Sequence, residues 1–168
     1  MIQLPGPSCY DIMPVRYRAE GVSMGRVRLL LVDDEDDFRT ALAGSLRERA
    51  FEVTDVESGY RAIEEVKRGN IDVAVLDVRM PGMDGCETLR QMKSIDSTIE
   101  VIMLTGQAPT ESGREGMRLG AFDYVGKPCD LDALVLRINA AYLKRQGHAD
   151  RSGRPPSEIL PDSSMTEV

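Results

Sequence analysis

Three short runs of the chain are almost continuously apolar, and each is followed by a stretch whose apolar residues recur at helical spacing. The runs are VRLLLV (27–32), DVAVLDV (72–78) and EVIMLT (100–105). Parallel strands read in this way because the helices that connect them cover both faces of the sheet. The pattern therefore predicts an α/β protein built on a parallel sheet.

Two weaker strands complete five strand–helix repeats: FEVTDVE (51–57), which alternates apolar and polar residues, and FDYV (122–125). Right-handed crossovers between such strands give an open, doubly wound sheet. Five helices are predicted between and after these strands. The first has Phe38, Ala41, Leu42, Ser45 and Leu46 on its inner face, and the second is capped by Ser58, carries Ala62, Ile63 and Val66 inward and ends at Gly69. The third runs from about Asp84 to Lys93 with Cys86, Leu89 and Met92 inward, the fourth from about Pro109 to Leu119, and the fifth from Asp130 to Arg145.

The composition describes a chain with enough apolar residues for one core, since 42% of its 168 residues are hydrophobic and 29% are charged. The net charge of −7 opposes direct nucleic-acid binding, which favours a basic surface. No apolar run is long enough for a membrane span, and the N-terminus lacks the apolar core of a signal peptide. The three cysteines have no metal-site spacing. We therefore expect a cytoplasmic protein.

The regular pattern is confined to residues 26–146, which we predict to be a single domain. Residues 1–25 mix proline, glycine and charge without a period, and residues 147–168 are rich in proline and serine. Both segments have the composition of disordered chain. Two glycines, Gly113 and Gly116, weaken the predicted fourth helix. They indicate either close packing against a neighbour or a helix of low stability that can reorder.

Five consecutive acids, residues 33–37, follow the first strand. Neighbouring carboxylates repel one another, so this charge has to be offset or solvated. Glu35, Asp36 and Asp37 fall at the start of a helix, where free backbone N–H groups favour negative charge. Asp33 and Asp34 belong to the strand end, and they need a different explanation.

Other strands also end in polar residues, and in an open parallel sheet these carboxyl ends meet at one edge. Asp77 ends the third strand, Thr105 ends the fourth, and Lys127 follows the fifth. Clustered carboxylates need a hard cation, and oxygen ligands favour Mg²⁺. A carboxylate there can attack phosphorus as a nucleophile, while an ammonium and a hydroxyl neutralise and bind the transferred group.

The motifs at these positions are LVDDE (31–35), VLDVRMPGMDG (75–85), VIMLTG (101–106) and GAFDYVGKP (120–128). In them the chain resembles the receiver domain of two-component response regulators. The resemblance implies a flavodoxin-like (βα)5 fold with strand order 2-1-3-4-5. It also implies that Asp77 accepts a phosphoryl group from a sensor histidine kinase or a phosphotransfer protein.

The resemblance further assigns roles to individual residues. Asp34 and Asp77 would bind Mg²⁺ directly, with Asp33 acting mainly through water and the backbone carbonyl of Arg79 as a further ligand. Lys127 would contact the phosphoryl group.

The resemblance also implies that the peptide bond from Lys127 to Pro128 is cis. Thr105 and Tyr124 would form a switch pair, in which Thr105 moves toward the phosphoryl group and Tyr124 turns inward. Arg79 and Gln107, each two residues beyond a site residue, would overhang the site and modulate it. We expect Arg79 to shield the acyl phosphate from water.

Several residues also have simpler interpretations. Lys127 alone would be a surface lysine, and Tyr124 a packing aromatic. Cys129 is better explained as a small buried residue than as a redox group, and His148 as inert. A magnesium-dependent phosphatase of the aspartyl-phosphate type would need a second acid where Arg79 stands. A nucleotide-binding Rossmann protein would need a glycine-rich turn in place of VDDEDD.

The expected function is that of a stand-alone receiver, because residues 147–168 are too few and too polar for an output domain. The signal would then pass to an unknown downstream protein that binds the face formed by the fourth helix, the fifth strand and the last helix, or onward by phosphotransfer. A phosphorylation-dependent homodimer is a further option. Such a chain catalyses only its own phosphorylation and dephosphorylation, and is otherwise not an enzyme.

Overall fold

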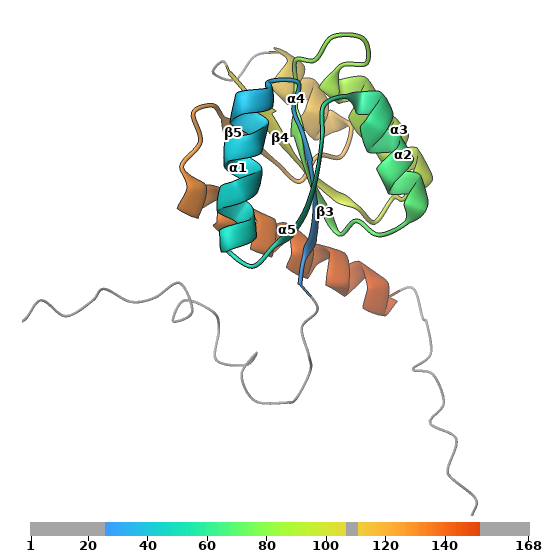
Figure 1. The fold of residues 1–168 in the computed structure, drawn as a ribbon. Coiled ribbons are helices and arrows are strands. Elements are labelled where there is room, and N and C mark those ends of the chain that lie inside the picture. Colours follow the sequence, from blue (N-terminus) through green and yellow to red (C-terminus); the bar gives the residue numbers. More distant parts are fainter. Residues whose placement is uncertain (1–25, 107–110, 152–168) are drawn as a thin grey trace, which may run out of the picture.

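The computed structural model describes residues 26–106 and 111–151, and within them five strands alternate with five helices (Figure 1). Short strands and crossover helices alternate in these residues, as the sequence pattern predicted. The elements are β1 (Arg28–Val32), α1 (Asp36–Glu48), β2 (Glu52–Val56), α2 (Gly59–Arg68), β3 (Val73–Asp77), α3 (Gly85–Ile95), β4 (Glu100–Thr105), α4 (Glu111–Arg118), β5 (Asp123–Gly126) and α5 (Leu131–Arg151).

The strands form one parallel sheet in the order β2-β1-β3-β4-β5, which confirms the predicted fold class. The chain moves outward from β1 to β2 and then returns across β1 to β3. Doubly wound sheets bind ligands above the carboxyl ends of the strands that flank such a reversal, which here are β1 and β3.

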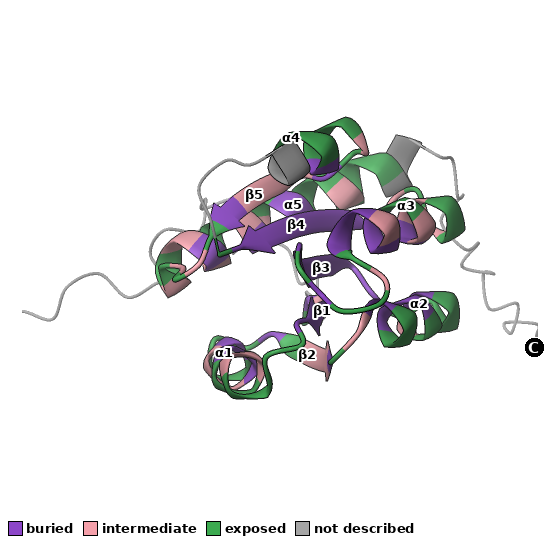
Figure 2. Ribbon diagram, turned by 90° about the horizontal axis from the view of Figure 1, so that it is seen from above, coloured by how far each residue is buried: buried purple, intermediate pink, exposed green. Residues whose placement is uncertain are grey.

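Helices cover both faces of the sheet, and the sheet separates two clusters of core residues. Alternate residues of each strand point to opposite faces, so Leu29 and Leu31 pack with α1 and α5, whereas Leu30 and Val32 pack with α2 and α3. Figure 2 shows β3 and β4 buried, as is nearly all of β1, whereas the edge strands β2 and β5 are only partly buried and the outer sides of the helices are exposed. The sheet interior is therefore a rigid platform for the side chains at its upper edge.

The helix ends follow the sequence signals closely. The Ser58 side chain accepts a hydrogen bond from the backbone N–H of Arg61 and caps α2, which ends at the left-handed Gly69 with φ of 81°. Asp84 caps α3 in the same way. Glu35 stands at the N-cap position of α1, and Asp36 and Asp37 lie in its first turn. These three acids therefore belong to the helix start, as predicted.

Two details of the predicted helices were wrong. Ala41 is exposed on α1 and Ala43 is buried instead, because Leu42 and Leu46 set the centre of the inner face and Ala43 lies closer to it. The last helix continues to Arg151 rather than ending at Arg145.

Residues 147–151 are thus helical and do not begin a tail. A single glycine, Gly147, costs only about 1 kcal/mol in a helix, which is too little to end one that is anchored over several turns. Within the described residues, neither α5 nor any other helix has the length and apolar character of a membrane span. The remaining parts of the predicted disordered segments, 1–25 and 152–168, lie outside the described residues.

The glycine-rich helix α4 packs closely on the sheet. Gly116 is buried, and a Cβ atom there would lie 3.4 Å from Cγ of Met103 on β4. This contact supports the packing explanation for Gly116. Whether α4 reorders during signalling remains a prediction.

A partly buried ion pair lies at the lower edge of the sheet, at the opposite end of β1 and β3 from Asp33 and Asp77. Asp72, which precedes β3 and is 5% exposed, accepts hydrogen bonds from Nε and Nη2 of Arg28 at 3.0 and 2.6 Å, and from the Arg28 backbone N–H at 2.9 Å. Burial by itself would raise the pKa of Asp72, but the bonds from Arg28 outweigh it and hold this pKa below its usual range. This end of β3 is therefore stabilised by a charged carboxylate.

Candidate functional site

The carboxyl end of β1 presents two aspartates with different surroundings. Asp33 is fully buried, and Asp34 is exposed at the rim. The backbone N–H of Asp33 donates to the Val56 carbonyl at 3.2 Å, which extends the pairing with β2 by one residue. Oδ1 of Asp33 accepts a hydrogen bond from the backbone N–H of Glu35 at 2.9 Å. The strand end is therefore held on both sides, and the Asp33 carboxylate points inward.

The third aspartate, Asp77, is the last residue of β3 and is 4% exposed. Its carboxylate accepts a hydrogen bond from the backbone N–H of Arg79. The loop after it is tied down by two backbone hydrogen bonds, from Val78 to the Leu104 carbonyl at 2.8 Å and from Gly85 to the Val78 carbonyl at 3.0 Å. Asp77 therefore stands in a well-fixed position beside the end of β1.

The three carboxylates and one ammonium form a compact cluster. One oxygen from each of Asp33, Asp34 and Asp77 lies within 4.8 Å of the others. Nζ of Lys127, from the loop after β5, lies 2.6 Å from Oδ2 of Asp33 and 3.6 Å from Oδ1 of Asp77. The sequence prediction that these four side chains meet at one edge is confirmed.

Lys127 is held in place from several directions. Its backbone N–H donates to the Thr105 carbonyl at 2.6 Å, and its peptide bond to Pro128 is cis, the conformation that the resemblance implied. Its ammonium also lies 3.3 Å from Oε1 of Glu35 and 4.4 Å from the ring centre of Phe38. The lysine thus reaches the acidic cluster with its charge already partnered.

The electrostatics of the cluster are dominated by burial. Burial raises the pKa of Asp77 to about 6; Lys127 acts in the opposite direction, and the negative charges of Asp33 and Asp34 add to the increase. Burial lowers the pKa of Lys127, but its pairing with Asp33 and Asp77 outweighs this and the net change is upward. One ammonium therefore only partly offsets three carboxylates.

The donor set fits a divalent cation. Oδ2 of Asp33 is buried and accepts no well-directed hydrogen bond within the described residues, although the Lys127 ammonium lies close enough for an ion pair. An oxygen in this state, next to two further carboxylates, is suited to a hard cation. The cluster of Asp33, Asp34 and Asp77 is thus a candidate metal site.

Thr105 and Tyr124 lie on neighbouring strands beside this cluster. Thr105 ends β4, is 2% exposed and pairs with Gly126, while Tyr124 lies opposite Met103 on the same strand pair. Tyr124 is partly buried against the core beneath α2 and α3. The structure therefore brings both predicted switch residues to the same side of the site.

The remaining predicted positions are less central. Arg79 is exposed in the loop at the rim, and Gln107 lies outside the described residues. Cys129 is partly buried, and burial raises the pKa of its thiol, in line with a packing role. His148 is exposed on the last turns of α5.

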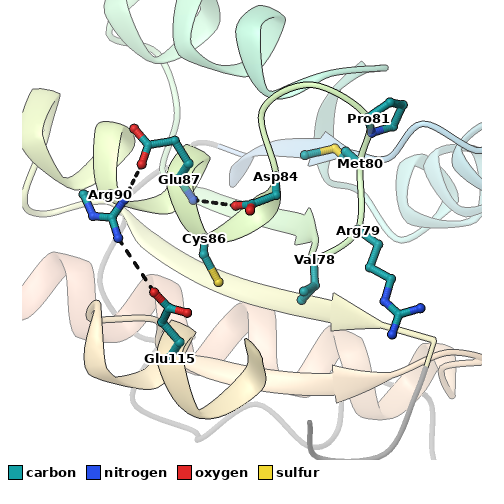
Figure 3. A pocket seen from close by; sticks show the side chains of 9 residues that line it. All are labelled: Val78, Arg79, Met80, Pro81, Asp84, Cys86, Glu87, Arg90 and Glu115. Atoms are coloured by element: carbon teal, nitrogen blue, oxygen red, sulfur yellow. Dashed lines mark hydrogen bonds and ion pairs between the residues drawn. The ribbon is translucent and has the colours of Figure 1, made fainter. Parts of the chain in front are cut away.

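A hollow of about 580 Å³ lies beside the acidic cluster, between the loop after β3, α3 and α4 (Figure 3). Val78, Met80 and Cys86 line it with apolar atoms, and Arg90 spans it by pairing with Glu87 and, at 3.8 Å, with Glu115 of α4. Burial raises the pKa of the Cys86 thiol, so this sulfur is a poor nucleophile. The hollow lies between α3 and α4, and Asp33, Asp34 and Asp77 are not among the residues that line it.

Sequence reasoning missed the contacts of Arg39 and Phe38 on α1. Arg39 donates to the Asp33 backbone carbonyl, and the Phe38 ring faces Lys127. The available signal was a basic residue three positions after Asp36, a spacing that places both on one side of a helix. It did not indicate that the arginine also reaches back to the strand end.

The doubly wound sheet carries three carboxylates and a lysine at its switch point, the arrangement expected of a receiver-type signalling domain. The family model described as the response regulator receiver domain matches residues 29–139, and the chain belongs to this family. It is therefore a receiver domain of the two-component type, a class of domain that histidine kinases phosphorylate.

Individual relatives agree with this assignment. The regulatory protein AtoC of Escherichia coli is 40% identical over 68% of this chain and 25% of its own length. The transcriptional regulatory protein CseB of Streptomyces avermitilis is 38% identical over 84% of this chain and 58% of its own length. A receiver domain structure from Clostridium thermocellum covers 73% of this chain and 98% of its own, with a TM-score of 0.70 and 28% identity. The chain thus spans about a quarter of the length of AtoC and about three fifths of the length of CseB.

Proposed function

We propose that this chain receives a phosphoryl group on Asp77 from the phosphohistidine of a sensor histidine kinase or a phosphotransfer protein. The observation that carries the proposal is the cluster itself, with oxygens of Asp33, Asp34 and Asp77 within 4.8 Å and the Lys127 ammonium between Asp33 and Asp77. Membership of the receiver family supports the same reaction.

In the proposed reaction, an Asp77 carboxylate oxygen attacks phosphorus and the bond from phosphorus to the histidine nitrogen breaks. The imidazole leaves with the bonding electron pair and takes up a proton. Lys127 neutralises charge on the incoming group, and the Thr105 hydroxyl donates a hydrogen bond to it. Asp34 and Asp77 would hold Mg²⁺ through their side chains, Asp33 through water and Arg79 through its backbone carbonyl, and the ion would supply further charge neutralisation.

The phosphoryl group then changes the face formed by α4, β5 and α5. Thr105 moves toward the phosphoryl group and Tyr124 turns inward behind it. Three large apolar side chains are exposed on the two helices of this face: Met117 at 49%, Leu136 at 58% and Leu143 at 43%. Their exposure supports a protein partner, with a second copy of the chain as the alternative.

The proposed domain comprises residues 26–146 together with the remaining turns of α5. The curated relatives are longer than the part of them that this chain matches, and the stand-alone arrangement stays a prediction. The chemistry proposed for the acidic cluster does not depend on it.

The first expected result concerns phosphorylation itself. With acetyl phosphate and MgCl₂ the wild-type chain should gain the mass of one phosphoryl group, and Asp77→Asn should gain none because the amide cannot attack phosphorus. Asp37→Asn is the matched control, since Asp37 lies in the same acidic run but on the helix surface. Intact-mass spectrometry after reaction in the presence and in the absence of EDTA measures the gain in mass of each variant. Modification of Asp77→Asn to the wild-type extent would overturn the proposal.

A second expected result concerns the lifetime of the acyl phosphate. Arg79 is exposed two residues beyond Asp77, and its side chain shields the phosphoryl group from attacking water. Arg79→Ala should therefore lose phosphate roughly threefold faster or more, because water gains access to the in-line position. Arg90→Ala, which removes an arginine from the neighbouring hollow, should leave the rate unchanged. Phosphate release after acetyl phosphate is removed measures the rate, and an unchanged or slower rate for Arg79→Ala would contradict the role.

A further inference from the structure

Arg39 of α1 contacts three parts of the structure near the upper edge of the sheet: the end of β1, β2 and the start of α1 itself. Nη1 donates to the backbone carbonyl of Asp33 at 2.8 Å, Nε to Oδ2 of Asp55 on β2 at 3.3 Å, and Nη2 to Oδ1 of Asp36 at 2.5 Å. The Arg39 side chain is only 13% exposed. A guanidinium donates in several fixed directions at once, so a single residue joins β1, β2 and the start of α1.

The hydrogen bond to the Asp33 carbonyl acts directly on the proposed metal ligands. This carbonyl belongs to the peptide unit that joins Asp33 to Asp34, and a peptide unit is planar. Fixing the carbonyl oxygen therefore fixes the direction in which the chain enters Asp34. Asp34 is exposed at the rim, so packing alone does not set the position of its carboxylate.

We infer that Arg39 is a positioning residue for the metal site, which holds the Asp33–Asp34 peptide in the orientation that lets both carboxylates face Asp77. The inference rests on the proposed function, because it assigns Mg²⁺ to this cluster. Residues that orient metal ligands from behind typically change metal affinity by about 10-fold to 100-fold when they are removed.

Charge alone would have the opposite effect. A cation near a metal site repels the metal, so a purely electrostatic role predicts that loss of the Arg39 charge strengthens Mg²⁺ binding. The charge of Arg39 is already paired with Asp36 and Asp55, which limits this repulsion. The direction of the change in affinity therefore separates positioning from charge.

The matched control is Arg47, which lies on the same helix and contacts the same aspartate. Nη2 of Arg47 lies 2.6 Å from Oδ1 of Asp55 and also donates to the Val53 carbonyl, away from the acidic cluster. Arg39→Gln and Arg47→Gln each remove one partner of Asp55. A merely structural loss would thus appear in both variants.

The experiment measures MgCl₂ binding to the unphosphorylated chain by calorimetry, and the MgCl₂ dependence of phosphorylation by acetyl phosphate. Arg39→Gln should weaken Mg²⁺ binding about tenfold while the rate at saturating MgCl₂ stays within about twofold of wild type. Arg39→Lys keeps the charge, but its single ammonium cannot serve the three acceptors in the same geometry, so it should also bind Mg²⁺ more weakly than wild type. Arg47→Gln should bind Mg²⁺ as the wild type does.

Unchanged or tighter Mg²⁺ binding by Arg39→Gln would overturn the inference, as would equal weakening in Arg39→Gln and Arg47→Gln. Wild-type Mg²⁺ binding identifies the source of a failure. If the wild-type chain binds no Mg²⁺, the proposed metal site itself is wrong. If it binds Mg²⁺ and Arg39→Gln does so equally well, only the role of Arg39 is wrong.

Discussion

Asp77→Asn is expected to raise the free energy of unfolding of the metal-free chain at pH 7 by about 1–3 kcal/mol. Burial, together with Asp33 and Asp34, raises the pKa of Asp77 from 3.8 to about 6, so the folded state holds this carboxylate charged at a cost. A pKa change of this size corresponds to at most about 3 kcal/mol. Asparagine keeps the shape and can still accept the Arg79 backbone hydrogen bond. The variant would therefore lose the phosphoacceptor and gain stability.

The pH dependence gives this prediction a definite sign. Between about pH 4 and pH 6 the folded wild-type chain binds more protons than the unfolded chain, so its stability falls as the pH rises through this range. The difference between Asp77→Asn and wild type should be small near pH 4 and reach its full value above about pH 6. Urea denaturation at several pH values, in EDTA, measures it.

Added MgCl₂ should reduce this advantage, because a ligand that binds only the folded wild type stabilises it by RT ln(1 + [L]/Kd), where [L] is the free Mg²⁺ concentration. Asp37→Asn, on the helix surface, should change stability by no more than about 0.5 kcal/mol at any of these pH values. A metal-free Asp77→Asn chain that is less stable than wild type at pH 7 would show that Lys127 more than compensates the charge of Asp77.

Gly85→Ala is expected to destabilise the fold by about 2–4 kcal/mol. A Cβ atom on Gly85 would lie 2.4 Å from the backbone oxygen of Asp77 and 2.8 Å from Cα of Val78. Both are backbone atoms at the end of β3, so they cannot turn aside as a flexible side chain can. The substitution must displace either the start of α3 or the peptide that carries the phosphoacceptor.

The matched control is Gly44→Ala, in the interior of α1, where a Cβ atom would meet nothing within 4 Å. It should stabilise the chain by about 0.5–1 kcal/mol, because alanine loses less backbone entropy in a helix. Thermal or urea denaturation compares the two variants directly. Equal stability of Gly85→Ala and wild type would mean that the loop after β3 yields freely, and Asp77 would then not be held as firmly as its hydrogen bonds indicate.

The main features of the site could be predicted because parallel strands align their ends. Asp33, Asp77, Thr105 and Lys127 are far apart in the sequence, yet each follows or ends a strand, and the sheet brings strand ends to one edge. The strand order then explains why the site lies where it does, since the switch point of the sheet is between β1 and β3. Periodicity and strand ends together were sufficient for this part.

The contacts of α1 could not be predicted in the same way. A helical pattern indicates which face is buried but not how far a long side chain extends. The hydrogen bond from Arg39 to the Asp33 carbonyl could therefore not be predicted from it. One residue of the inner face was also assigned wrongly, Ala41 in place of Ala43, since alanine carries little hydrophobic signal. The end of α5 was placed too early because residues 147–168 were judged disordered from their proline- and serine-rich composition.

Strand β3 joins two buried carboxyls whose responses to acid are opposite. Asp72, below it, has a lowered pKa and stabilises the fold as long as it is charged, whereas Asp77, at its upper end, has a raised pKa and does so when it is neutral. Acidification from pH 7 first protonates Asp77 and only later, below the usual range of an aspartate pKa, removes the charge of Asp72. As far as these two groups determine it, the metal-free chain has its stability optimum in mildly acidic solution, and a bound cation would move that optimum toward neutral pH.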